Sequence, residues 1–502
     1  MESMEEKGSV IQEFYRDANI FITGCTGFMG KVLMEKLLRS CPYINKIYVL
    51  VRRKKGKDMH TRLEDIFNEP LFMKLKQEQP KFCHKVTAVS GDCIEPGLGL
   101  SPSDRQLLAE EVDVVFHCAA TVRFDEKLRI AVGINVRGTE SVLQLAREMR
   151  RLKVIIHVST AYCNCPLPEI EEKFYDLPLS HKKVTNIVDN MDDNMLDKIT
   201  PDFLGNWPNT YAYTKAVSED LVREQGVGMP IGVFRPAIVL ATRTEPLWGW
   251  IDNVYGPTGV FIGAGIGLMR TLHCDLKKVA NLVPVDMTIN ALIVSAWDVA
   301  KKPRAESCDD IPIYNYVSSV QKPLTWEEFM EKTSRFGFSV PPAQAVWYYS
   351  FTLNKYYFIH LLYVLFLHFL PAVLIDGVAM LFGKQTNLVK IYKKIHRFNS
   401  VISYFATREW KFTNDNVQAL WKKVDAKDRR LFDFDIDGLD WEEYFFRYVR
   451  GIRVYLMKDD LSTVPVGIKK NKRLRWAHQV VKTLVLLLLL RIIWAIFNFI
   501  FL

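Results

Sequence analysis

The sequence predicts an α/β protein: a doubly wound parallel sheet, then a smaller, mainly α-helical C-terminal domain and a hydrophobic C-terminal anchor. Three observations predict this arrangement. Short segments rich in Val, Ile and Phe alternate with segments of helical periodicity, which is typical of parallel sheets. Helical periodicity dominates beyond residue 345, and the last residues are almost entirely apolar. Because 502 residues exceed one core of usual size, we expect domains at 15–340 and 345–455, and an anchor at 483–502.

The first element is a strand that turns into a helix through three glycines. NIFITG (19–24) has the apolar, β-branched pattern of a buried strand, and leucines at helical spacing follow. Gly24 allows a tight turn, Gly27 lets the backbone approach a pyrophosphate, and Gly30 lets the helix pack close to the strand. The free amides and positive end of the helix favour phosphate. This pattern predicts a Rossmann-like, dinucleotide-binding turn rather than a turn that contains glycines by chance. Its expected cofactor contacts are Thr23, Gly24, Thr26, Gly27, Phe28, Met29 and Gly30.

The second strand, KIYVLV (46–51), ends in two arginines. A cofactor without a 2′-phosphate usually meets an acidic residue at this point, whereas arginine suits the 2′-phosphate of NADPH. Arg52 and Arg53 therefore favour NADPH. The alternative is a solvated basic loop, because Lys54, Lys55 and Lys57 continue the run.

The third and fourth strands complete the expected cofactor site. KVTAVSGD ends at Asp92, where a carboxylate is well placed to contact an adenine edge. VDVVFHCAATVRF contains the small residues Ala119 and Ala120, beside which a cofactor ribose can lie close to the backbone. The helical segment NVRGTESVLQLAREM follows, as the alternation of strands and helices requires.

The fifth strand and the next helix carry the candidate catalytic residues. KVIIHVSTAY ends in Ser159 and Thr160, and PNTYAYTKAVSEDL contains Tyr211 and Lys215 at the i, i+4 spacing of one helix face. A neighbouring ammonium favours the phenolate and is expected to lower the tyrosine pKa from about 10. Tyr211 is then the candidate general acid, while the hydroxyl of Thr160 or of Ser159 stabilises the same substrate oxygen. Tyr213 is the alternative, but its i+4 residue is valine, so Tyr211 is preferred.

These motifs resemble the extended short-chain dehydrogenase/reductase superfamily and, as a set, the alcohol-forming fatty acyl-CoA reductases. The resemblance covers about residues 15 to 450. The motifs that carry it are TGCTGFMGKVLMEKLLRSCP, HCAATVRFDE, HVSTAYCN, PNTYAYTKA, GWIDNVYGPTG and LVPVDMTIN. Their C-terminal continuation is similar to the family's male sterility type domain.

The resemblance implies a substrate, a cofactor and residue roles. Long-chain acyl-CoA is reduced with NADPH to an aldehyde and then to a primary alcohol, with CoA released. By motif position, Thr160, Tyr211 and Lys215 are catalytic, and Pro236 lies where the chain passes the nicotinamide. Asn135 matches an asparagine that supports the lysine, although a buried helix asparagine bonded to backbone explains it equally well. The thioester chemistry agrees, because a phenol and a hydroxyl suit a hemithioacetal oxyanion.

Composition narrows the compartment and the partners. All nine cysteines precede residue 309, and the first ten residues are polar and acidic without a signal pattern, so we expect a reducing, cytosol-facing catalytic domain. Cys163 and Cys165 lack a second pair at metal spacing, so no metal is expected. The net charge of +9 suits membrane lipid and CoA phosphates better than nucleic acid, for which no motif is present.

Two apolar segments predict contact with lipid. Residues 356–382 are apolar apart from two histidines and Asp376, and Pro371 divides them into pieces shorter than a membrane span. An interfacial or re-entrant hairpin and a buried helical pair are equally compatible with this pattern. Residues 483–502 are long enough to span, contain Arg491 as a costly charge, and follow the basic cluster 469–475. The pattern fits a membrane anchor better than a buried core helix, with a half-inserted or tilted course as an alternative.

Three function hypotheses follow from these features. The first is an alcohol-forming fatty acyl-CoA reductase on the membrane of the endoplasmic reticulum or the peroxisome. The alternative is a membrane-bound dehydrogenase or isomerase acting on a sterol or nucleotide sugar, and the third is a scaffold without activity. The intact glycine turn with Thr160, Tyr211 and Lys215 disfavours the scaffold. The sequence leaves open the acyl length, the choice between the two organelles and the oligomeric state.

Overall fold

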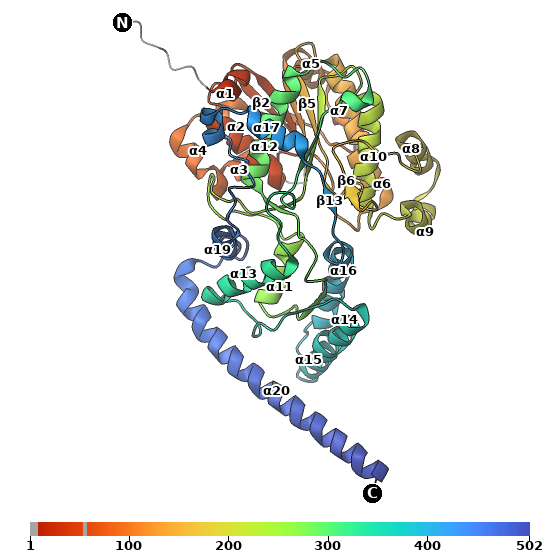
Figure 1. Cartoon of the computed structure of the whole chain (residues 1–502), viewed down its shortest axis with the longest axis vertical. Helices are drawn as coiled ribbons and strands as arrows, with labels where there is room; N and C mark the ends of the chain where they lie inside the picture. Colours follow the sequence, from red (N-terminus) through yellow and green to blue (C-terminus); the bar gives the residue numbers. More distant parts are fainter. Residues whose placement is uncertain (1–8, 54–57, 502) are drawn as a thin grey trace. The chain divides into compact units, whose positions relative to one another are not determined.

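The computed structural model describes residues 9–53 and 58–501, and one of its sheets has seven strands (Figure 1). All neighbouring strands run parallel, in the order β11-β7-β5-β4-β1-β2-β3. The predicted parallel sheet is therefore confirmed. Its strands are β1 (Asn19–Thr23), β2 (Lys46–Val51), β3 (Val86–Ser90), β4 (Val114–His117), β5 (Val154–Val158), β7 (Ile231–Pro236) and β11 (Ile313–Tyr316).

The strand order makes the sheet doubly wound. From β1 the chain adds β2 and β3 on one side, and then returns to add β4, β5, β7 and β11 on the other. The order reverses between β1 and β4, and in such sheets ligands bind in the crevice at the carboxyl ends of the strands. The glycine turn after β1 and the small residues after β4 lie at this point.

Helices cover both faces of the sheet. Helices α2 (Phe28–Ser40) and α12 (Val285–Lys301) pack against each other on one face, and α12 also contacts β5 and β7. Helix α7 (Gly138–Glu148) packs against α5 (Pro102–Glu111) and α10 (Thr210–Gln225) on the other (Figure 1). Apart from the half-buried edge strand β3, the strands are almost wholly buried, as expected for a sheet covered on both faces.

The chain forms two compact units that alternate along the sequence. Unit 1 combines the described residues up to Trp250 with Val279–Leu324 and Glu409–Asp440, and contains the whole seven-stranded sheet. Unit 2 combines Ile251–Lys278, Thr325–Arg408 and the residues from Trp441 onward. The ranges expected from the sequence are a reductase domain at 15–340, a helical domain at 345–455 and an anchor at 483–502. They are contiguous, unlike these two units, and they stay a prediction.

Residues 409–440 return to complete unit 1. Strand β13 (Lys411–Phe412) pairs with β6 (Glu169–Ile170), and helix α17 (Asp415–Lys423) packs against β11 and α12. The Asn416 side chain donates to the Ile313 carbonyl at 2.8 Å, and the Asp428 carboxylate accepts from the Val10 amide at 3.0 Å. The edge strand β11 is thus covered by a late part of the chain.

Unit 2 is mainly helical. Helix α13 (Trp326–Ser339) packs against α19 (Trp441–Gly451), and α14 (Tyr357–Val364) contacts the short strand β9 (Thr271–His273). Its other long elements are α11 (Pro257–Gly265), η6 (Leu365–Phe369), α15 (Leu370–Leu381), α16 (Leu388–Ala406) and α20 (Val464–Phe501). Two stretches of this unit, Tyr357–Leu381 and Leu461–Phe501, are long and apolar enough to cross a membrane.

The segment 356–382 differs from both expectations. Tyr357–Leu381 is one continuous helical run, so it is not a hairpin of two pieces. Only 22% of its most apolar 18-residue stretch is buried, so it is not a buried helical pair either. Pro371 lies in the first turn of α15, directly after the π-helical turn η6. Pro371 has no backbone amide to donate, but the π-helical turn before it changes the hydrogen-bond pattern at this point, so the helix does not require that donor. The proline therefore does not break the run.

Candidate active site

Two of the three glycines are required by the packing of the chain itself. Gly24 has a φ of +75°, and a Cβ there would lie 2.7 Å from the Ala119 amide nitrogen. A Cβ on Gly30 would overlap the Gly24 carbonyl oxygen and lie 2.7 Å from the Cys25 Cα. Close approach of β1, β4 and α2 therefore leaves no room for a side chain at either position.

Gly27 is different, because the chain leaves space around it. It is exposed, has a φ of −90°, and a Cβ would meet only the Gly24 carbonyl oxygen, at 3.3 Å. It is the N-cap of α2, and no side-chain hydrogen bond caps that helix within the described residues. The uncapped backbone amides at the start of α2 and the exposed Gly27 form a site, here called the cradle, that a Cβ at position 27 would narrow. The cradle fits a dinucleotide pyrophosphate.

Thr23 lies beneath the turn rather than at its surface. It is fully buried, and its hydroxyl bonds to the His117 ring nitrogen Nδ1 at 2.7 Å and accepts from the Ala119 amide at 3.2 Å. Thr23 therefore joins β1 to the loop after β4 and holds Ala119 in place. Thr26, Phe28, Met29 and Ala120 are partly exposed around this point.

The carboxyl ends of β2 and β3 bring the predicted adenosine contacts together. The Arg52 guanidinium lies 3.7 Å from the Asp92 carboxylate and is 66% exposed, so it remains accessible to a ligand. Arg53 donates to the Ser90 hydroxyl at 2.9 Å, and Arg62 donates to the Arg52 carbonyl. Arg62 was not predicted from the sequence. The only indication of it was a basic residue near the start of the helix that follows β2. Lys54, Lys55 and Lys57 lie outside the described residues.

The candidate catalytic residues meet at the carboxyl end of β5. Asn209 caps α10 by accepting from the Ala212 amide at 2.8 Å, which places Tyr211 in the first turn. Lys215 follows one turn later, is only 2% exposed, and donates to the Val158 carbonyl at 2.7 Å. The hydroxyl of Thr160 lies beside the Tyr211 phenol as a hydrogen-bond partner.

Ser159 is the second hydroxyl at this end of β5. It is 3% exposed, and its oxygen has no hydrogen-bond partner within the described part of the chain. A side-chain hydrogen bond from Thr160 favours the phenolate form of Tyr211 and so lowers its pKa against the larger effect of burial. Both hydroxyls stay candidates for holding the substrate oxygen, and Thr160 is the one that influences the Tyr211 phenol.

Burial controls both proton affinities in this group. Burial raises the pKa of Tyr211 to about 12, against the opposing effect of the Thr160 hydrogen bond. Burial lowers the pKa of Lys215 to about 8, although Cys118 and Glu219 oppose this change. The expectation that Lys215 lowers the Tyr211 pKa was wrong for this structure. Its ammonium is directed to the Val158 carbonyl, and loss of solvent around the phenol outweighs any attraction.

Two buried histidines lie close to Lys215 and were missed by sequence reasoning. His117 and His157 face each other in register on β4 and β5, with ring centroids 5.5 Å apart. Burial, and then the charge of Lys215, lowers the pKa of His117 to about 3 and holds the pKa of His157 well below its ordinary value. The imidazoles of His117 and His157 are therefore neutral near the Lys215 ammonium. The available signal was a histidine directly before the small residues of both strands, in HCAA and HVST.

Asn135 and Pro236 lie around this centre without touching the ammonium. Asn135 accepts from the Thr121 amide at 2.9 Å and donates to the Thr214 hydroxyl at 2.9 Å, so it joins the loop after β4 to α10. The Pro236 carbonyl at the end of β7 accepts from the Ala161 amide at 2.9 Å. Both residues position neighbours of the candidate catalytic group.

The alternative tyrosines belong to the core. Tyr213 is 2% exposed and packs edge-to-face against Phe203 and Trp207. Tyr162 is buried and packs in the same way against Trp410 and Phe412. Neither ring is open to a substrate, whereas Tyr211 is partly exposed.

A buried ion pair supports the back of α10. Glu219 holds the Arg235 guanidinium through two bonds of 2.8 and 2.6 Å, and Arg235 also donates to the carbonyls of Glu171 and Lys173. Arg235 is 0% exposed, and Cys163 donates its thiol to the same carboxylate at 3.2 Å. The pair therefore ties α10 to β7 and to the segment after β5.

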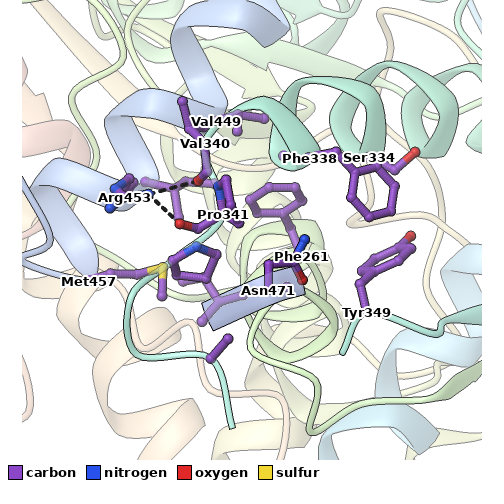
Figure 2. A pocket seen from close by; sticks show the side chains of 16 residues that line it. Phe261, Ser334, Phe338, Val340, Pro341, Tyr349, Val449, Arg453, Met457 and Asn471 are labelled. Carbon is purple, nitrogen blue, oxygen red and sulfur yellow. Dashed lines mark hydrogen bonds between the residues drawn. The ribbon is translucent and has the colours of Figure 1, made fainter. Parts of the chain in front are cut away.

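Unit 2 contains a separate pocket with mostly apolar walls (Figure 2). Phe261, Phe338 and Tyr349 line it, and Asn471 of α20 contributes a polar group. The Arg453 guanidinium at its edge donates to the carbonyls of Val340 and Pro341, so the charge is bound within the protein. None of the predicted catalytic or cofactor residues lines this pocket.

Known proteins with similar sequences cover nearly the whole chain. A family model described as male sterility protein, of an NAD-binding type, matches residues 22–292, and a second of the same description matches residues 367–459. A Drosophila melanogaster protein named fatty acyl-CoA reductase wat is 43% identical over 94% of this chain and 90% of its own length. Human fatty acyl-CoA reductase 1 is 36% identical over 96% and 93%, respectively.

Solved structures agree on the fold. The reductase domain of a non-ribosomal peptide synthetase from Mycobacterium tuberculosis has a TM-score of 0.56 and 19% identity, and covers 87% of this chain and 92% of its own. The terminal R domain of the myxalamid pathway has a TM-score of 0.55 at 19% identity, covering 87% and 91%. At this identity the likeness shows the fold alone. The relatives that are 43% and 36% identical over nearly the whole chain, together with the two matching family models, show that the chain belongs to the fatty acyl-CoA reductase family.

Proposed function

We propose that this protein reduces long-chain fatty acyl-CoA to the primary alcohol and free CoA with NADPH. The observation that carries the proposal is the meeting of Thr160, Tyr211 and Lys215 at the carboxyl end of β5, in the unit that holds the glycine turn. A nicotinamide dinucleotide fits the cradle at Gly27 and supplies hydride when bound. Two equivalents are needed for each alcohol, because a thioester lies two reductions above it.

The chain's own residues handle the oxygen and the proton. In the first reduction, the thioester oxygen becomes the oxyanion of a hemithioacetal, which the Tyr211 and Thr160 hydroxyls hold. Collapse of this oxyanion forms the aldehyde and expels the CoA thiolate, which needs little help from an acid. In the second reduction, the aldehyde oxygen becomes an alkoxide and takes the Tyr211 proton. Solvent then returns the proton to Tyr211, while the Lys215 ammonium stays bound to the Val158 carbonyl at the end of β5.

The raised pKa of Tyr211 agrees with this role. With a pKa of about 12, the Tyr211 phenol keeps its proton at neutral pH, and it is still a strong enough acid to protonate an alkoxide. Membership of the acyl-CoA reductase family disfavours the alternative of a sterol or nucleotide-sugar dehydrogenase.

The direct test is incubation of the full-length protein with NADPH and a series of acyl-CoAs of different chain length. We expect one free thiol and one alcohol for every two NADPH oxidised, measured by thiol titration, lipid chromatography and absorbance. Oxidation of a sterol or nucleotide sugar with added NADP+, together with no thiol release from any acyl-CoA, would contradict the proposal and support the alternative.

We also propose NADPH rather than NADH, because Arg52 is exposed at the end of β2. A hydrogen bond to a charged group contributes about 1.5–3 kcal/mol, so Arg52→Asp should lower kcat/KM with NADPH by roughly 10- to 150-fold. It should leave kcat/KM with NADH nearly unchanged. Arg150→Asp removes an exposed arginine elsewhere in unit 1 and should change neither value. Equal use of both cofactors by the unmodified protein would refute the assignment.

Residues 483–502 are proposed as the membrane anchor of this enzyme. Residues 483–501 form the last part of α20, and none of the most apolar stretch of that helix is buried. The basic cluster 469–475 precedes them, so anionic headgroups on the cytosolic side of the endoplasmic reticulum or peroxisome suit this position. Arg491 lies among enough Leu, Ile and Phe residues to offset its insertion cost of about 2.5–3.5 kcal/mol.

A further inference from the structure

The helical run Tyr357–Leu381, here called the apolar helix, exposes large hydrophobic side chains along its whole length. Met380 and Leu381 are 74% and 83% exposed, which is unusual for residues of this kind in a folded protein. Other exposed members are Phe358, Leu362, Phe366, Val373, Leu374 and Val378. Such a surface indicates a partner or a membrane.

Only a narrow stripe of the apolar helix faces the protein. His360, Val364, His368 and Ala372 are all less than 10% exposed and recur at every fourth residue. This spacing places them on one side of the helix. The arrangement reverses that of an ordinary surface helix, because two polar histidines face inward and the apolar residues face solvent.

Polar bonds join the apolar helix at three points to other elements of unit 2. The His360 ring bonds to the Thr271 hydroxyl at 3.1 Å, and the His368 ring accepts from the Arg270 amide at 2.8 Å. The Asp376 carboxylate accepts from the amides of Leu388 and Val389 at 3.0 Å each, at the start of α16. His368 also bonds to His396 of α16 at 3.1 Å.

These bonds exclude a course across the bilayer. Residues 360, 368 and 376 are eight apart, so at 1.5 Å per residue their bonds cover about 24 Å of the helix axis. This approaches the thickness of the hydrocarbon core, which is about 30 Å. If the helix spanned, α16 would be drawn to the same depth, and it exposes Lys390, Lys393, Lys394 and Arg397. Each of these charges would cost about 2.5–3.5 kcal/mol near the centre.

We propose that the apolar helix lies in the plane of the membrane, with its outer face immersed among the headgroups and upper acyl chains of one leaflet. Lipids of one leaflet contact every side of an immersed helix that does not face the protein. This agrees with the exposure of the apolar side chains outside the buried stripe. Tyr356 and Tyr357 begin the run, where amphipathic rings suit the interface, and the exposed basic residues of α16 suit anionic headgroups. Unit 2 thus makes a second lipid contact besides residues 483–502.

The test places a fluorophore on the outer face of the apolar helix in the full-length protein. Leu374→Cys is labelled with an environment-sensitive dye, in a background where the exposed Cys83 and the partly exposed Cys118 and Cys308 are serine. In vesicles of phosphatidylcholine and phosphatidylserine, we expect blue-shifted emission and quenching by lipids spin-labelled near the headgroup. Met195→Cys is the matched control, because it is an exposed apolar residue of unit 1, at 54% against 60%. Its dye should stay quenched by aqueous iodide.

The topology is tested by labelling both flanks of the helix. Thr352→Cys and Lys384→Cys are exposed and should react with a membrane-impermeant maleimide from the same side of sealed vesicles. Protection of one flank until the vesicles are lysed would show a spanning helix and overturn the proposal. Iodide quenching at position 374 equal to that at 195 would overturn it too. Shielding at 374 without lipid quenching, dependent on protein concentration, would assign the face to a second copy of the chain and would also overturn it.

Discussion

Replacing Tyr211 with phenylalanine is expected to lower the rate of alcohol formation by about 10²–10⁴-fold, the usual contribution of a positioned acid. The substitution keeps the ring and removes only the hydroxyl that Thr160 accompanies. The loss should appear in kcat/KM with acyl-CoA and with added aldehyde, while the binding of NADPH, measured by fluorescence, should change little.

The two reductions are not expected to lose rate equally. Expulsion of a thiolate needs little proton donation, whereas an alkoxide must be protonated to leave as alcohol. Free aldehyde should therefore form a larger share of the products of Tyr211→Phe than of the unmodified enzyme. An aldehyde-trapping reagent measures this share directly.

Tyr213→Phe is the matched control for this experiment. It removes a hydroxyl from the same helix, but the Tyr213 ring packs in the core against Phe203 and Trp207. It should leave both reductions near their original rates. If Tyr211→Phe kept full activity and Tyr213→Phe lost it, the proton donor would have to be reassigned.

Replacing Glu219 with glutamine is expected to lower the free energy of unfolding by about 3–5 kcal/mol, because it leaves the Arg235 charge buried without its counter-ion. Glutamine keeps the shape of the side chain, so the loss reports the charge rather than a cavity. Arg235 is 0% exposed, and water cannot compensate at that position. Urea unfolding in detergent, followed by tryptophan fluorescence, measures the change.

An exposed ion pair supplies the comparison. Asp176→Asn removes one of the two carboxylates that bind Arg223, at a similar distance of 2.6 Å, but the Asp176 side chain is 95% exposed and Asp220 remains at 2.9 Å. Its effect on unfolding should be small, because exposed pairs contribute little. Equal losses for Glu219→Gln and Asp176→Asn would contradict the importance of burial at Arg235.

Local patterns were sufficient to predict β1 to β5 and the glycine turn. Most of these strands contain a continuous apolar run, and the residues that matter for the turn lie within eight positions of one another. The pairing of Tyr211 with Lys215 also follows from local spacing on α10. The sequence-based prediction missed β7 and β11, because Gly232 and Arg235 interrupt the first and Asn315 the second.

Non-local contacts explain the remaining differences. Nothing near Glu409–Asp440 indicates that these residues complete unit 1, because their partners Ile313 and Val10 lie far away in sequence. The direction of the Tyr211 pKa depends on burial, which spacing along a helix does not reveal. In the apolar helix, His360 and His368 looked like interruptions of an apolar run and are in fact its attachment points to unit 2.

The interleaved order of the two units has a consequence for synthesis. The sheet unit cannot be completed when its first 250 residues leave the ribosome, because α17 and the partner of Val10 come from Glu409–Asp440. At about 5–20 residues per second, the interval between residues 250 and 440 is roughly 10–40 s. Throughout that time, the edge of the nascent sheet lacks the helix that covers it, and an uncovered parallel edge is prone to wrong pairing. Production of this enzyme should therefore depend on chaperones that hold the unfinished sheet until its last segment arrives.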